Sequence, residues 1–212
     1  WPDQIEALRT LADERIGDRP GTRLEGEVRL AALLAASGPI GGVAASLTSS
    51  TARAVRAVLF DKTVDANWIV AWHQDRTIPV VARIDLEGFG PWSTKDGVPH
   101  VAPPFDILAR MVTLRVHLDP VDDANAPLRI ALESHRLGRI AADQAESVAA
   151  SGKQRVCHAE VGDIWAYRTP ILHTSDRATT PGRRRVLQVD YADFDLPGGL
   201  EWRPLEAAGG TR

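Results

Sequence analysis

Hydrophobic positions near the start of the chain recur at helical spacing. Between residues 3 and 16 they share one side of a predicted helix, with charged residues between them: Ile5, Leu8, Leu11, Ala12 and Ile16. The segment from Gly17 to Gly21 is expected to end this helix. A second helix is predicted over 23–36, and Gly38-Pro39 together with Gly41-Gly42 interrupts it. Residues 1–50 are therefore expected to form a helical layer.

From about residue 54 the pattern changes to short runs that are rich in β-branched residues and often alternate. Eight such runs predict strands: 54–60, 67–73, 78–84, 112–118, 128–132, 155–160, 164–173 and 184–191. Short helices are predicted at 105–111 and 141–150. Helices ahead of a strand-rich remainder indicate a mainly β fold, a sandwich or jelly-roll barrel with helices packed outside. We expect a single domain, residues 1–212, with its β core at 54–202.

Composition limits the classes of partner. The chain has 212 residues, of which 44% are hydrophobic, and this favours one globular unit over two. With 25 Lys plus Arg against 28 Asp plus Glu, the net charge of -3 offers no electrostatic case for a nucleic acid or an anionic membrane. We therefore expect a small-molecule substrate. The pattern does not predict an oligomeric state.

The single cysteine, Cys157, excludes an intrachain disulfide and any metal site that needs several thiolates. No apolar run approaches the roughly 20 residues needed to cross a bilayer. The N-terminus lacks a basic region followed by an apolar one. A reducing cytoplasm is the expected location, and it would also keep iron ferrous.

Candidate metal ligands occur in two predicted strands. His73 and Asp75 lie two residues apart, so strand alternation places both side chains on one face. His173 ends another predicted strand. Two histidines and a carboxylate make the facial triad typical of non-haem iron(II) oxygenases, which leaves three coordination positions open. A strand histidine is often simply hydrogen-bonded, and it is the order of the residues along the chain that favours a metal site.

A cation is also needed if the iron binds a ketoacid with a distal carboxylate. Arg184 begins the predicted strand after His173, and its planar guanidinium can bind a carboxylate through two hydrogen bonds. Arg183, Arg184 and Arg185 are consecutive, and spacing alone does not choose among them. The same triplet is also typical of a solvated patch. Ser175 follows His173 closely enough to donate a hydrogen bond to the same carboxylate.

Together these motifs resemble the phytanoyl-CoA dioxygenase family of iron(II) and 2-oxoglutarate oxygenases. The resemblance covers most of residues 54–202 and rests on Trp72-His73-Gln74-Asp75, Leu118-Asp119 to Asn125 with Leu128, Ser134-His135-Arg136, Gly162-Asp163, and His173-Thr174-Ser175 followed by Arg184. The family fold is a double-stranded β-helix. The resemblance implies that His73, Asp75 and His173 bind Fe(II), that Arg184 and Ser175 hold the cosubstrate 2-oxoglutarate, that Trp92 borders the pocket, and that O2 is consumed.

A compact bacterial branch of that family is more similar still. The shared segments are Leu59-Phe60-Asp61-Lys62, Asn67-Trp68, Trp92-Ser93 with Lys95-Asp96-Gly97, and Leu196 to Trp202. One departure is Leu132-Glu133, where the family usually has Pro-Gly. In related halogenases the carboxylate ligand is replaced by Gly or Ala, whereas this chain retains Asp75. The resemblance therefore implies hydroxylation and not halogenation.

Polar residues near the motifs are candidates for choosing the substrate. Thr113, Arg115 and His117 share one face of a predicted strand, and that face lines the barrel interior or meets solvent. Others surround the H-x-D strand in sequence and favour a small polar substrate over a long acyl chain: Lys62, Asn67, Gln74, Thr77 and Lys95. The alternative for this second set is turn chemistry and exposed charge.

The sequence thus predicts an iron(II)- and 2-oxoglutarate-dependent hydroxylase. Its substrate would be a small polar metabolite, such as an amino acid or a natural-product intermediate, and succinate and CO2 would be released. Two alternatives stay open, because a fold does not specify a function. One is a noncatalytic barrel that binds a metal or a ligand. The other is a cupin-type oxygenase that does not use 2-oxoglutarate and would not need Arg184.

Overall fold

The strands form three antiparallel sheets in the computed structural model, which describes residues 1–16, 21–180 and 182–205. The largest sheet has the order β1 (Gly21–Arg23), β2 (Arg53–Lys62), β12 (Arg184–Ala192), β7 (Val112–His117) and β10 (Ile164–Arg168). A second sheet has the order β3 (Val70–His73), β11 (His173–Ser175), β8 (Leu128–Ala131) and β9 (Gln154–Cys157). The third consists of β4 (Ile78–Pro79), β6 (Val98–Val101) and β5 (Trp92–Lys95).

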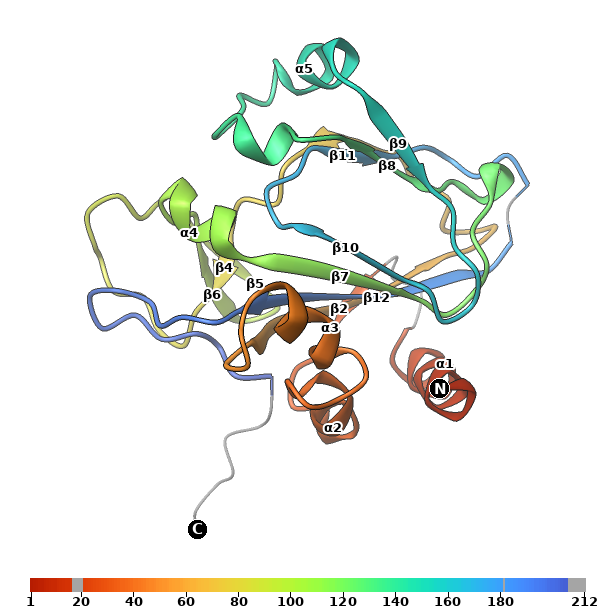
Figure 1. The fold of residues 1–212 in the computed structure, drawn as a ribbon, viewed down its shortest axis with the longest axis horizontal. Coiled ribbons are helices and arrows are strands. Elements are labelled where there is room, and N and C mark those ends of the chain that lie inside the picture. The colour runs from red at the N-terminus through yellow and green to blue at the C-terminus, as the bar shows by residue number, and fades with distance from the viewer. Residues whose placement is uncertain (17–20, 181, 206–212) are drawn as a thin grey trace.

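Helices cover the outer faces of the first two sheets (Figure 1). On the large sheet lie α1 (Pro2–Arg15), α2 (Ala31–Leu34) and α3 (Gly41–Leu47), and α5 (Ala145–Ser151) lies on the second sheet. The remaining α-helix, α4 (Phe105–Arg110), leads into β7. Short 3-10 helices occupy Val28–Leu30, Asp123–Asn125 and Ser134–Arg136. The two larger sheets face each other, so the predicted mainly β jelly-roll barrel is confirmed.

Alternation along the strands of the large sheet separates an apolar core from a polar interior. Ala57 and Leu59 of β2 pack under the helices with Leu187 and Val189 of β12 and with Leu114 of β7. Burial of each large aliphatic side chain in this layer stabilises the fold by about 1.5–3 kcal/mol. The intervening residues of the same strands face the space between the sheets. Those residues carry most of the polar and charged side chains of the site.

The structure changes two of the predicted elements and adds a hairpin that was not predicted. The helix over 23–36 is limited to α2 and one preceding 3-10 turn, and the glycines expected to interrupt it begin a further helix, α3. Gly41 is required there because a Cβ atom would lie 2.1 Å from the carbonyl oxygen of Ala35. The strand over 78–84 is shortened to β4. The β5–β6 hairpin was not predicted. The expected end of the first helix, at residues 17–21, lies largely outside the described residues.

The predicted strand 164–173 is two strands that belong to different sheets. β10 ends at Arg168, and β11 begins at His173. Pro170 lies between them and cannot donate a ladder hydrogen bond, so the chain turns there and crosses from the large sheet to the second sheet. This crossing places His173 opposite the polar face of the large sheet. Among the described residues, no helix has the length and apolar character needed to cross a membrane.

Candidate metal centre

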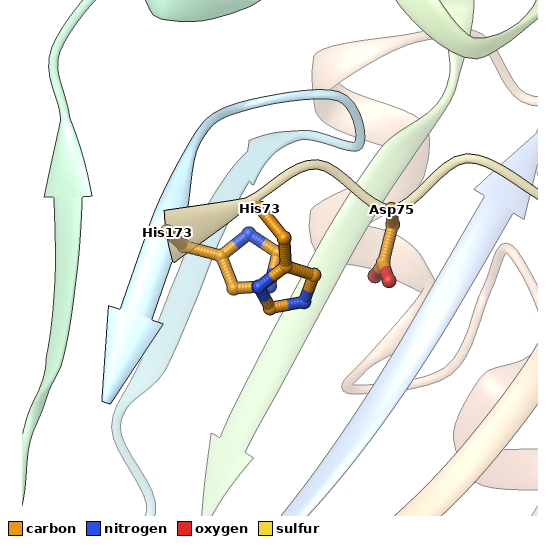
Figure 2. A group of neighbouring side chains, drawn as sticks. All are labelled: His73, Asp75 and His173. Atoms are coloured by element: carbon orange, nitrogen blue, oxygen red, sulfur yellow. The ribbon is translucent and has the colours of Figure 1, made fainter. Parts of the chain in front are cut away.

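His73, Asp75 and His173 converge on one point between the two larger sheets. β3 and β11 are antiparallel neighbours, and their register pairs His73 with His173. The two imidazole rings lie side by side, with centroids 4.2 Å apart, and the Asp75 carboxylate is beside them (Figure 2). One candidate ligand atom from each residue lies within 4.8 Å of the others. β3 ends at His73, so Asp75 reaches this cluster from the extended segment that follows the strand.

Hydrogen bonds determine which ring nitrogen of each histidine can bind a metal. Nδ1 of His73 donates to the carbonyl oxygen of Ala71 at 2.8 Å, and Nδ1 of His173 donates to that of Ile171 at 3.0 Å. Because a carbonyl can only accept, Nδ1 carries a proton in both rings, which leaves Nε2 as the nitrogen that can bind a metal. Burial lowers the pKa of His173 to about 4, which keeps this imidazole neutral at physiological pH.

The Asp75 carboxylate is oriented through one of its two oxygens. Oδ2 accepts hydrogen bonds from Arg56 at 2.9 Å and from Gln188 at 3.1 Å. Within the described segments no hydrogen bond involves Oδ1, so this oxygen is left for a metal. Burial disfavours the ionised carboxylate, but the positive charge and the hydrogen bond of Arg56, together with the two neighbouring histidines, outweigh that effect and hold the pKa of Asp75 below its usual range.

Arg56 also compensates a second buried carboxylate. Its Nε lies 2.5 Å from Oδ2 of Asp190, and the Thr113 hydroxyl donates to Oδ1 of Asp190 at 2.8 Å. Gln188 is held in turn by Arg115, whose guanidinium donates to Oε1 at 2.7 Å. The sequence analysis did not identify Arg56 as a site residue. A charged residue in the middle of an apolar strand was the signal that could have found it.

A cavity of about 400 Å³ lies between the sheets, and the three candidate ligands form part of its wall. Phe60, Val58, Val70 and Leu128 give it apolar sides. Polar residues of the large sheet also reach it. Thr113, Arg115 and His117 are all on the interior face of β7, as the first of the two sequence readings proposed.

The three consecutive arginines have different environments. Arg183 pairs with Asp61 at 2.9 Å, and Arg185 pairs with Asp119 at 2.8 Å. Arg184 points the other way, into the cavity, and is only 4% exposed. Its guanidinium donates to the carbonyl of Ala126, and no carboxylate within the described ranges pairs with it. Burial lowers the pKa of Arg184 to about 10.

Lys62 and Ser175 stand beside Arg184. Lys62 pairs with Arg184 in the β2–β12 register, and its Nζ lies 2.6 Å from the carbonyl oxygen of Asp176 and 3.4 Å from the Ser175 hydroxyl. Burial, followed by the charge of Arg184, lowers the pKa of Lys62 to about 8. Arg184 and Ser175 line the cavity, whereas Lys62 is beside Arg184 on the neighbouring strand and does not line it. Two cations and a hydroxyl donor therefore gather near one end.

Three residues expected near the substrate instead make contacts within the protein. Gln74 bridges loops by donating to the carbonyls of Gly138 and Pro170. The Asn67 side chain exchanges hydrogen bonds with the backbone of Ala178. Thr77 accepts a hydrogen bond from Lys95 at 3.0 Å. Of these residues, only Lys95 lines the cavity.

Two further expectations are changed by the structure. Trp92 does not line the cavity, because its ring packs against a separate core near Ile78 and Val101. His117 is buried behind the cavity wall, with neither ring nitrogen hydrogen-bonded in the described part of the chain. Burial lowers the pKa of His117 to about 3, so it remains neutral.

The sequence and the fold both have counterparts among known proteins. The sequence matches the family described as Phytanoyl-CoA dioxygenase (PhyH) over residues 8–186. The chain belongs to this family. Membership confirms the oxygenase class expected from the sequence. No curated protein matches the chain.

Several solved structures share the fold at low sequence identity. SnoK, titled a non-heme alpha ketoglutarate dependent carbocyclase from nogalamycin biosynthesis, is 15% identical with a TM-score of 0.62, covering 95% of this chain and 78% of SnoK. HygX from Streptomyces hygroscopicus, with nickel, 2-oxoglutarate and hygromycin B bound, is 15% identical with a TM-score of 0.58, covering 90% of this chain and 78% of HygX. EvdMO1 is 19% identical over 75% of this chain with a TM-score of 0.52, and the match spans only 30% of EvdMO1.

Proposed function

We propose that this protein is an iron(II)- and 2-oxoglutarate-dependent dioxygenase that hydroxylates a small polar metabolite and releases succinate and CO2. The observation that carries the proposal is the convergence of His73, Asp75 and His173 in a cavity that also holds Arg184 without a carboxylate partner among the described residues. Two imidazoles and one carboxylate suit ferrous iron. When bound, iron(II) supplies the coordination positions at which 2-oxoglutarate and O2 react.

Each side chain has a distinct part in this proposal. Nε2 of His73, Nε2 of His173 and Oδ1 of Asp75 would hold the metal. Arg56 and Gln188 orient the Asp75 carboxylate, since both donate to its other oxygen. Arrangements of this kind around a ligand typically affect metal affinity by 10- to 100-fold.

The distal carboxylate of 2-oxoglutarate would bind at Arg184 and Ser175. Arg184 is buried, points into the cavity and has unused donors, and the neighbouring Lys62 adds a second positive charge. A carboxylate there would satisfy donors that burial leaves unpaired, at no further desolvation of the arginine. HygX has been solved with nickel and 2-oxoglutarate bound, which supports assigning this cosubstrate.

Cavity size and ligand set support the finer parts of the proposal. A volume of about 400 Å³ is within the range of small-molecule sites. Asp75 would supply the third protein ligand of the metal. A halide would therefore not find the coordination position that is left open when a halogenase lacks this carboxylate. Hydroxylation is therefore preferred over halogenation.

The first experiment measures succinate release with Fe(II), ascorbate and 2-oxoglutarate, both without a substrate and across a library of polar metabolites. Wild type is compared with His73→Ala and Asp75→Ala, which each remove one proposed ligand. We expect succinate release to fall to the no-enzyme background in both variants. Turnover that stays at the wild-type rate in either folded variant would contradict the proposed centre.

The second experiment separates this function from a cupin-type oxygenase that does not use 2-oxoglutarate. Calorimetry on the nickel-loaded protein compares Arg184→Leu with Arg183→Leu, a matched change at a residue paired outside the cavity. Loss of charged hydrogen bonds worth about 1.5–3 kcal/mol predicts roughly 10- to 100-fold weaker 2-oxoglutarate binding in Arg184→Leu. Equal affinity in the two variants would favour the alternative enzyme.

A further inference from the structure

The cavity carries a charge opposite to that of the whole chain. The protein has a net charge of -3, yet the cavity wall includes one carboxylate, Asp75, and five cationic side chains: Arg23, Arg56, Lys95, Arg115 and Arg184. Arg56 is compensated by Asp75 and Asp190. Arg23 pairs with Asp96, and the other three cations, Lys95, Arg115 and Arg184, exceed what a single cosubstrate carboxylate requires.

Apart from Arg115, these cations lie in two groups at different positions along β2. Lys62 and Arg184 are paired across β2 and β12, near the C-terminal end of β2. Arg56 lies six residues earlier on the same strand, and a strand of that length spans about 20 Å. Arg23 is opposite Val58 in the β1–β2 register, and the charges of Arg56 and Arg23 both act on Lys95. Arg23 is therefore level with a residue four positions before Lys62, which separates it from the proposed 2-oxoglutarate anchor by roughly 13 Å along the strand.

Lys95 is held in place at the end of a hairpin. It is the last residue of β5 and pairs with Val98 across a tight turn, in which Asp96 and Gly97 both have positive φ. Its Nζ donates to the Thr77 hydroxyl, two residues from Asp75 in sequence. The described residues place no carboxylate in ion-pair contact with this ammonium, so two of its three donors remain for a ligand.

Arg23 presents a second donor beside Lys95. One guanidinium nitrogen pairs with Asp96 at 2.6 Å, which ties β1 to the hairpin turn. Nε of Arg23 is buried and has no hydrogen-bond partner in the described chain. Burial and then the charges of Arg56 and Arg23 lower the pKa of Lys95. A bound anion would relieve this repulsion and satisfy the unpaired donors.

We propose that the primary substrate carries an anionic group, a carboxylate or a phosphate, which Lys95 and Arg23 bind at the end of the cavity away from Arg184. This inference rests on the proposed function, because that function assigns Arg184 to the cosubstrate. The apolar walls at Val58 and Phe60 would contact the body of the substrate between its charged group and the metal. The substrate class is thus an anionic small molecule with an apolar portion.

Binding of matched probes to the nickel- and 2-oxoglutarate-loaded protein tests the proposal. Fluorine NMR titrations compare 4-fluorobenzoate, 4-fluorophenyl phosphate and neutral 4-fluorobenzamide, with the cosubstrate anchor already filled. Wild type is compared with Lys95→Met, Lys95→Arg and Lys153→Met, the last removing the same charge from an exposed lysine. Circular dichroism verifies that each variant is folded.

We expect at least one anionic probe to bind wild type and Lys153→Met with equal affinity. Its affinity should be about tenfold weaker for Lys95→Met and should return toward the wild-type value in Lys95→Arg. The preferred anion distinguishes a carboxylate from a phosphate substrate. The proposal would be overturned by any of three results. These are equal affinity for the anion and the amide, no binding of either anion to wild type, and an affinity for the anion that Lys95→Met leaves unchanged. Calorimetric binding of 2-oxoglutarate to wild type tests the proposed function independently, so failure of the two can be told apart.

Discussion

Replacing Arg56 with methionine is expected to destabilise the protein strongly. Arg56 lies between the Asp75 and Asp190 carboxylates, at 2.9 and 2.5 Å, and Asp190 is only 2% exposed. Methionine has a similar length but no charge, so both carboxylates would lose their compensating cation. Removing one partner of a buried ion pair typically costs about 3–5 kcal/mol. For a chain of this size that corresponds to a decrease in Tm of roughly 6–20 °C.

Differential scanning calorimetry at pH 7.5 gives the measurement, with Arg53→Met as the control. Arg53 lies on the same strand, but it pairs with Asp195, whose side chain is 92% exposed, so this pair contributes at most about 1 kcal/mol. The double variant Arg56→Met with Asp190→Asn should recover part of the loss, because it also removes a buried charge. A Tm for Arg56→Met within about 2 °C of that of Arg53→Met would refute the reasoning.

The pH dependence of this variant provides a second check. Burial already raises the pKa of Asp190, and the loss of Arg56 would raise it further. A carboxyl group whose pKa is higher in the folded state binds a proton more readily there, so stability falls as pH rises. The Tm difference between wild type and Arg56→Met should therefore narrow from pH 8 to pH 5. A gap that widens over this range would contradict the assignment.

Two other groups give predictions that do not involve the metal centre. Glu27 accepts hydrogen bonds from Arg29 and Arg15, which lower its pKa to about 2. The ionised carboxylate therefore stabilises the folded protein fully above about pH 4.5, and this stabilisation is lost as pH falls toward 2. Glu27→Gln should thus lower Tm at pH 7 and much less at pH 3, and an equal decrease at both would argue against a charged role. Cys157 is buried, and burial raises its pKa to about 11. Ellman's reagent at pH 8 should detect no thiol in the native protein and one in urea.

Local sequence was sufficient to identify the candidate metal ligands and most strands of the core. His73 and Asp75 are two residues apart, so their convergence needs only the geometry of an extended chain. The apolar positions of β2, β7 and β12 recur every second residue, and this spacing alone predicts one buried face. The position of Arg184 after His173 was also available from chain order. These features depend on neighbours in the sequence.

Only the tertiary structure decided which arginine enters the cavity and what supports Asp75. Arg183 and Arg185 pair with Asp61 and Asp119, which lie 122 and 66 residues away in the chain, and no local periodicity encodes such partners. The same applies to the contact of Arg56 with Asp75 and to the approach of Lys95 to Thr77. Strand pairing brings these groups together, and burial then determines their charge and hydrogen bonding. The sequence by itself therefore determined which residues could bind a metal, whereas packing between distant strands decided the surroundings of that site and the charge of its cavity.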